Sequence, residues 1–261
     1  MTQPLIKAMT AAIDALQKWP AKKVHIFHHN DADGLSSGAI LTRAFERQGF
    51  EIERLCLEKP YPRLLEKIFD REGGLNVFTD MAGRIAPLIS DLNKGRNLTL
   101  ILDHHVAHPA SDPQVHNLDP DLFGLKGDRD ISASTTCYLF AHTMDPANVD
   151  LAHIAAIGAV GDGFYVDGHL ASDNRKVVLE AARQGKLEIK TTDTGEQYFL
   201  KSSYQDTLLE ALARDLDILG AAGYLDQGPE VGVQVCLEGK TAMADQMLAR
   251  FKQIQQKTFA D

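Results

Sequence analysis

Three side chains that could bind a metal ion follow one another where an apolar segment of the chain ends. Asp103, His104 and His105 come directly after the apolar residues 98–102. A short, largely apolar run is typical of a strand buried on both faces of a sheet, so the end of that strand places all three side chains together. The triplet therefore predicts metal chemistry.

Carboxylates end three further apolar segments. Asp31 and Asp33 follow residues 24–27, Asp80 follows residues 75–79, and Asp162 follows residues 154–160. Two divalent cations about 3.5 to 4 Å apart need a bridging carboxylate and several more oxygen and nitrogen donors, and together they activate water and neutralise phosphate oxygens. The four clusters supply a suitable number of donors for such a pair.

The segment Asp-Ala-Asp-Gly is expected to present several ligands and an anion site side by side. If this segment is extended, Asp31 and Asp33 point the same way, and His29 shares their parity. Ser36 and Ser37 are then expected to open a helix whose free N–H groups receive a phosphate. This arrangement suits phosphoester chemistry.

Each motif alone also has an ordinary structural explanation. Asp31 and Asp33 could shape a turn, Asp80 could be a helix N-cap, and one of the two adjacent histidines could be a core residue. The conjunction of all four motifs at strand ends favours the metal site.

The order of the expected elements indicates an α/β fold with a mostly parallel sheet flanked by helices. Strands are expected at 24–27, 52–57, 75–79 and 98–102, with helices at 4–19, 37–48, 63–70 and 85–92. Right-handed crossovers place all four strand ends on one edge of such a sheet, where ligands gather.

Beyond residue 134 the pattern becomes helical. Helices are expected at 135–144, 151–160, 171–184, 204–219 and 240–257, with a small hairpin at 186–200. We expect a catalytic α/β domain at 1–185, and at 186–261 a hairpin and helices that complete the core or lead to another domain.

The charge and cysteine content of the chain argue against some classes of function. The formal charge of −9 disfavours strong binding to duplex DNA, because that affinity comes mainly from Lys and Arg at phosphates. Three isolated cysteines fit a reducing cytoplasm, and no apolar run approaches the roughly 18 residues of a membrane span. A cytoplasmic protein is expected.

Four stretches, HHNDADGLSSGAIL, VFTDMAGR, ILDHHVAH and AVGDGFY, resemble the four motifs of the DHH phosphoesterase superfamily, and most of all its RecJ-like branch. The resemblance covers about residues 20–235. That superfamily contains single-strand exonucleases, oligoribonucleases, cyclic dinucleotide phosphodiesterases and manganese-type pyrophosphatases.

The resemblance implies a role for each matching residue. The metal ligands would be His29, Asp31, Asp33, Asp80, His104 and Asp162, with Asp80 or a neighbour bridging. Asp103, His104 and His105 would be catalytic, with Asp103 orienting the histidines. Oxygen and imidazole donors without thiolate favour two Mn²⁺ ions, with Mg²⁺ or Co²⁺ as substitutes. The cleft would contact substrate through Ser36, Ser37, Arg84, His105, Ser134 and Thr135.

Two departures from the family pattern affect substrate binding. Phe27 stands where many small-substrate relatives carry a histidine, so His29 is taken as the histidine ligand. No glycine-rich GGGH-like motif follows Gly163. We therefore expect either a stand-alone catalytic domain or a chain from which a C-terminal substrate domain has been removed.

The leading hypothesis is a metal-dependent phosphoesterase acting on single-stranded oligonucleotides or small nucleotides. The alternatives are an inorganic pyrophosphatase or exopolyphosphatase, which would need more Lys and Arg near the metals, and an inactive module that senses a nucleotide. A homodimer is also considered, although the sequence identifies no interface.

Overall fold

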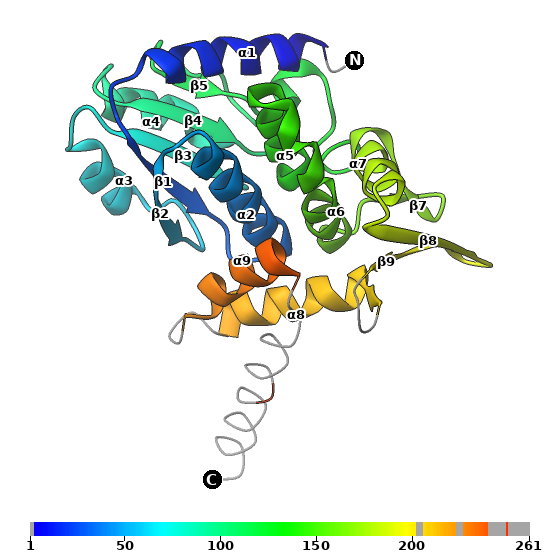
Figure 1. Cartoon of the computed structure of the whole chain (residues 1–261). Coiled ribbons are helices and arrows are strands. Elements are labelled where there is room, and N and C mark those ends of the chain that lie inside the picture. Colours follow the sequence, from blue (N-terminus) through cyan, green and yellow to red (C-terminus); the bar gives the residue numbers. More distant parts are fainter. Residues whose placement is uncertain (1–2, 202–205, 223–226, 240–248, 250–261) are drawn as a thin grey trace.

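The computed structural model describes residues 3–201, 206–222, 227–239 and 249, and its centre is a five-stranded parallel sheet (Figure 1). The strand order is β2-β1-β3-β4-β5. The strands are β1 (Lys23–His28), β2 (Glu51–Cys56), β3 (Leu75–Thr79), β4 (Leu98–Leu102) and β5 (Val115–Asn117). The predicted parallel sheet is confirmed, and all of its strands end at the same edge.

Helices cover both faces of the sheet. One face carries α1 (Gln3–Lys18), α2 (Ala32–Arg47) and α5 (Ala133–Met144), and the opposite face carries α3 (Pro62–Phe69) and α4 (Ala86–Asn93). Along β4, Leu100 and Leu102 join the core beneath the first group, whereas Ile101 joins the core beneath the second. This alternation follows from the two-residue period of a strand, and it explains why β4 is buried throughout.

The fifth strand, β5, was not predicted. It has three residues, Val-His-Asn, and lies at the edge of the sheet, where it pairs with β4. A strand this short, with a single fully buried residue, carries too little apolar periodicity to be recognised from sequence.

The later part of the described chain adds helices and a hairpin. It contains α6 (Ala152–Gly161), α7 (Ser172–Arg183), α8 (Leu209–Ala222) and α9 (Gly228–Glu238), with short strands β6 (Tyr165–Val166), β7 (His169–Leu170) and β10 (Thr207–Leu208). The predicted hairpin is confirmed as β8 (Leu187–Thr192) and β9 (Gly195–Leu200), paired antiparallel. The described residues also contain short 3₁₀ helices, which are η1 (Gly83–Ile85), η2 (Pro120–Phe123) and η3 (Pro146–Leu151).

One apolar core runs across the domain boundary predicted at residue 185. Tyr198, Leu209 and Leu216 belong to the same buried cluster as Leu41 and Leu100. Apart from residue 249, the helix expected at 240–257 lies outside the described residues, as does the start of the one expected at 204–219. In the described part of the chain, each helix is too short or too polar to cross a bilayer.

Candidate metal centre

Asp80 lies at the centre of the site, immediately after β3. Its backbone adopts a left-handed φ of 60°, and its N–H donates to the carbonyl of Leu102, 3.2 Å away, at the end of the neighbouring strand. Non-glycine residues rarely adopt this conformation, and such positions cluster at functional sites. The turn directs a carboxylate that is only 3% exposed into the space between two histidines.

One half of the site contains His29, Asp31 and Asp80. His29 Nδ1 lies 2.8 Å from Asp31 Oδ2 and 3.5 Å from Asp80 Oδ2. Asp31 also caps α2, because its Oδ1 accepts the N–H of Gly34 at 2.9 Å. One ligand atom from each of the three residues lies within 4.8 Å of the others. This spacing suits a shared cation.

The other half contains Asp33, His104 and Asp162, whose ligand atoms also lie within 4.8 Å of one another. His104 Nε2 is 3.3 Å from Asp80 Oδ1 and 3.5 Å from Asp162 Oδ2. His104 Nδ1 donates to the carbonyl of Gly127 at 2.8 Å, and since a carbonyl can only accept, the proton belongs on Nδ1. In the neutral ring Nε2 would offer its lone pair to a cation, whereas without a cation burial is outweighed by the bond to Asp80, which raises the pKa of His104 well above its ordinary value.

Asp33 is held in place by the start of α5. Its two oxygens accept the N–H groups of Ala133 at 2.7 Å and of Ser134 at 2.9 Å. Gly158 on α6 packs against the same carboxylate so closely that a Cβ there would overlap Asp33 Oδ1. Three helices thus fix the position of a fully buried acid.

Among the buried carboxylate oxygens that have no hydrogen-bond donor in the described residues are Oδ2 of Asp80 and Oδ2 of Asp162. A buried polar atom without a partner costs roughly 1–3 kcal/mol, and more when it is charged. Both belong to groups with metal-ligand spacing. The donor set therefore fits one cation in each half, with Asp80 shared between them.

The electrostatics of the site are those of several carboxylates buried close to one another. Burial, together with the charge of Asp31, raises the pKa of Asp80, and burial with the charge of Asp33 raises the pKa of Asp162. Burial lowers the pKa of His29, but the hydrogen bond to Asp31 and the nearby carboxylate of Asp80 outweigh burial and raise it to about 10. Bound cations would relieve the same repulsion between carboxylates.

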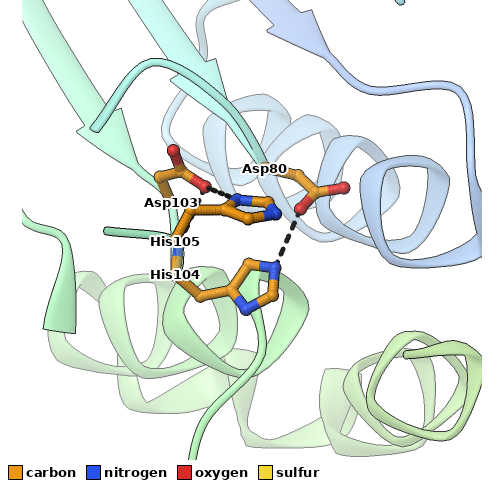
Figure 2. Close-up of side chains that lie close together, drawn as sticks. All are labelled: Asp80, Asp103, His104 and His105. Carbon is orange, nitrogen blue, oxygen red and sulfur yellow. Dashed lines mark hydrogen bonds and ion pairs between the residues drawn. The ribbon is translucent and has the colours of Figure 1, made fainter. Parts of the chain in front are cut away.

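Asp103 lies in a third group with metal-ligand spacing, together with Asp80, His104 and His105, and its carboxylate bonds to His105 (Figure 2). Its Oδ1 accepts from His105 Nδ1 at 2.7 Å and from the His104 N–H at 2.8 Å, and its Oδ2 accepts the N–H of Gly83 at 2.8 Å. The ring of His105 lies 4.2 Å from that of His104, and its side chain is 61% exposed. Asp103 thus orients His105 toward the open side of the site.

Of the five other sequence-predicted substrate contacts, four are buried in helices. Ser36 and Ser37 are fully buried in α2, and Ser134 and Thr135 are fully buried at the start of α5. Arg84 is exposed in η1, four residues after Asp80. Of these five, Ser134 reaches the ligand cluster, through its backbone N–H and not its hydroxyl.

The expectation that the Asp31–Asp33 segment is extended is wrong. Asp31 is the N-cap of α2, and Asp33 lies in its first turn. The helix therefore begins five residues before Ser37, because the Asp31 carboxylate satisfies the Gly34 N–H there. The two acids diverge, one to each half of the site.

Sequence reasoning missed three residues near the site. Gly127 supplies the carbonyl that holds His104. Asp119 is fully buried, and burial with the nearby charge of Asp103 raises its pKa to about 8. Asp217 on α8 accepts the N–H of Ala32 at 2.8 Å. A lone glycine and two isolated aspartates gave no motif that could have identified them.

Comparisons with known proteins found a related sequence and several solved structures with a similar fold. No protein-family model matches the chain. An uncharacterized protein of Methanocaldococcus jannaschii is 32% identical over 174 residues, which are 64% of this chain and 38% of that protein. The chain therefore spans well under half of this relative.

Solved structures resemble the chain over nearly its whole length. The exonuclease RecJ bound to manganese gives a TM-score of 0.62 at 16% identity, covering 97% of this chain and 66% of RecJ. RecJ of Thermus thermophilus in complex with Mn²⁺ gives 0.60 at 19% identity, covering 97% and 37%. The DHH domain of a member of the s1p family of ribosomal proteins gives 0.60 at 16% identity, covering 95% and 61%. This chain therefore has the α/β fold of the RecJ exonucleases and of that DHH domain.

Proposed function

We propose that this protein is a metal-dependent phosphoesterase that hydrolyses phosphodiester or phosphomonoester bonds in single-stranded oligonucleotides or small nucleotides with two bound cations. The observation that carries the proposal is the placement of Asp80, whose Oδ2 lies 3.5 Å from His29 and whose Oδ1 lies 3.3 Å from His104. A carboxylate with one oxygen in each of two ligand groups is what a bridged pair of cations needs.

Mn²⁺ is the cation we propose, with Mg²⁺ or Co²⁺ as substitutes. The donors are carboxylate oxygens and imidazole nitrogens without thiolate, a set that suits Mn²⁺. Two of the RecJ structures that share this fold are described with manganese. When bound, the cations would supply activation of water and neutralisation of phosphate oxygens.

The chain's own residues would then orient the substrate. Because His105 Nδ1 donates to Asp103, its Nε2 is left for a ligand on the open side of the site. Burial of Asp103 leaves its charge poorly solvated, and the hydrogen bond that His105 donates to Asp103 raises the pKa of His105. A protonated His105 would donate to a phosphate oxygen, and the exposed Arg84 is our candidate for a second phosphate contact.

The proposed substrate class rests on two arguments. RecJ, whose fold this chain shares, is described as an exonuclease. A formal charge of −9 disfavours broad capture of duplex DNA, so a short single strand or a small nucleotide fits better.

The test is Mn²⁺-dependent nucleotide release from 5′-labelled and 3′-labelled short single strands, run alongside 3′-phosphoadenosine 5′-phosphate, pyrophosphate and polyphosphate. Wild type should cleave a strand or nucleotide, and Asp80→Ala should not. Asp145→Ala is the matched control, because Asp145 accepts a backbone N–H from Ala147 at 2.9 Å but is no part of the ligand groups. Cleavage of pyrophosphate or polyphosphate alone would favour the inorganic alternative, and nucleotide binding without turnover would favour a sensor.

A further inference from the structure

Helix α8 lies against the metal-binding loops although it comes late in the chain. Ala213, Asp217 and Gly220 are spaced by four and three residues, so they share one face of this helix. Asp217 bonds to a residue beside a candidate ligand, and Ala213 and Gly220 lie near two others. The face is therefore part of the surroundings of the metal centre.

Asp217 makes the polar contact of this face. Its Oδ1 accepts the N–H of Ala32 at 2.8 Å, and Ala32 is the first residue of α2. The first N–H groups of a helix have no partner within the helix, so an external acceptor is needed. Ala32 lies between Asp31 and Asp33, so this bond fixes the peptide that separates the two halves of the site.

The other two residues of the face are small, and this lets the backbones approach. A Cβ on Gly220 would overlap the carbonyl oxygen of Asn30, the residue before Asp31. A Cβ on Gly161, the residue before Asp162, would lie 2.7 Å from Cβ of Ala32 and 3.6 Å from Cβ of Ala213. The helix therefore contacts both the loop that carries Asp31 and the helix end that carries Asp162.

We propose that Asp217 is a positioning residue of the metal centre, whose hydrogen bond to Ala32 sets the separation of Asp31 and Asp33 and so the affinity for cations. This inference rests on the proposed function, because it takes these two acids as metal ligands. Residues that hold metal ligands in place commonly change metal affinity by about 10- to 100-fold when they are replaced.

The test is Mn²⁺ binding by calorimetry, with the electron paramagnetic resonance spectrum of the bound ion, for wild type, Asp217→Ala, Asp217→Asn and the control Asp145→Ala. Asp217→Ala should bind Mn²⁺ about tenfold more weakly with an altered spectrum. Asp217→Asn keeps an oxygen acceptor for the Ala32 N–H and should stay within about twofold of wild type. Asp145→Ala should lose similar thermal stability without a change in Mn²⁺ binding.

Each result separates the two proposals. If wild type binds no Mn²⁺, or binds it as weakly as Asp80→Ala, the proposed function fails and this inference fails with it. If wild type binds Mn²⁺ and Asp80→Ala does not, the proposed function stands. In that case this inference alone is overturned if Asp217→Ala binds Mn²⁺ with wild-type affinity and spectrum. It is also overturned if Asp217→Asn binds Mn²⁺ as weakly as Asp217→Ala. Should the Ala variant not fold, Asp217→Ser carries the same expectation, because its side chain is one bond shorter.

Discussion

The carboxylate of Asp80 and the imidazole of His104 are joined across two neighbouring strands: Oδ1 of Asp80 lies 3.3 Å from Nε2 of His104, and the Asp80 N–H donates to the last residue of β4. The second oxygen of the same carboxylate has no hydrogen-bond donor among the described residues. A metal-free protein therefore carries a buried charge that is only partly compensated, and this arrangement has measurable consequences.

Asp80→Asn should stabilise the metal-free protein and abolish its stabilisation by Mn²⁺. The folded pKa of Asp80 is raised by burial, so its contribution to stability is present below its unfolded value, near 4, and is lost as pH rises through the folded value. The Tm of Asp80→Asn should therefore be higher than that of wild type, and the difference should be larger at pH 8 than at pH 5. Mn²⁺ at 100 times its Kd should add about 2.7 kcal/mol to wild type and nothing to the variant. Equal gains in both proteins would contradict Asp80 as a ligand.

Gly127→Ala should disturb the half of the site that contains His104. A Cβ at this position would overlap the carbonyl oxygen of His104, so the loop must move and the bond to Nδ1 is lost. We expect about 1–3 kcal/mol of destabilisation and at least tenfold weaker binding of one Mn²⁺ equivalent. The control is Gly185→Ala, where φ is 72° but a Cβ would meet nothing within 4 Å. Thermal denaturation and Mn²⁺ calorimetry measure both effects, and unchanged metal binding in Gly127→Ala would refute the prediction.

Asp103→Asn should lower the pKa of His105 in the metal-free protein. The hydrogen bond that His105 donates to Asp103 is the largest cause of its raised pKa, and an amide provides no negative charge. The imidazole titration followed by NMR should shift toward the ordinary value, near 6.5. Turnover should fall more than Mn²⁺ affinity, because Asp103 contacts His105 directly. A His105 titration that does not move would argue against this pairing.

His153→Gln should protect the protein from acid. Burial, and then the charge of Lys186, lower the pKa of His153 to about 4, whereas the unfolded value is near 6.5. Between these values the unfolded chain binds a proton that the folded chain does not, so stability is lost as pH falls from 6.5 toward 4. The loss should be roughly 3 kcal/mol in wild type and smaller in the variant. Urea denaturation at pH 8 and pH 4.5 measures it, and an equal loss in both proteins would rule out His153 as the cause.

Much of the fold was predictable because its signals are local. The largely apolar runs at 75–79 and 98–102 correspond residue for residue to β3 and β4, and the alternating 186–200 segment forms the hairpin. In contrast, β5 is too short to carry a period, and the start of α2 depends on a cap by Asp31 that residue types do not distinguish from an extended segment.

The sequence by itself determined which acids and histidines end the strands, because a strand's apolar run and the residue after it are adjacent in the chain. Only the tertiary structure decided that Asp80 reaches both His29 and His104, that Asp103 accepts a hydrogen bond from His105, and that Gly127 and Asp217 contact segments carrying candidate ligands. Asp217 and Ala32 are 185 residues apart. Such contacts arise from helix packing over a common core, and no local periodicity specifies them.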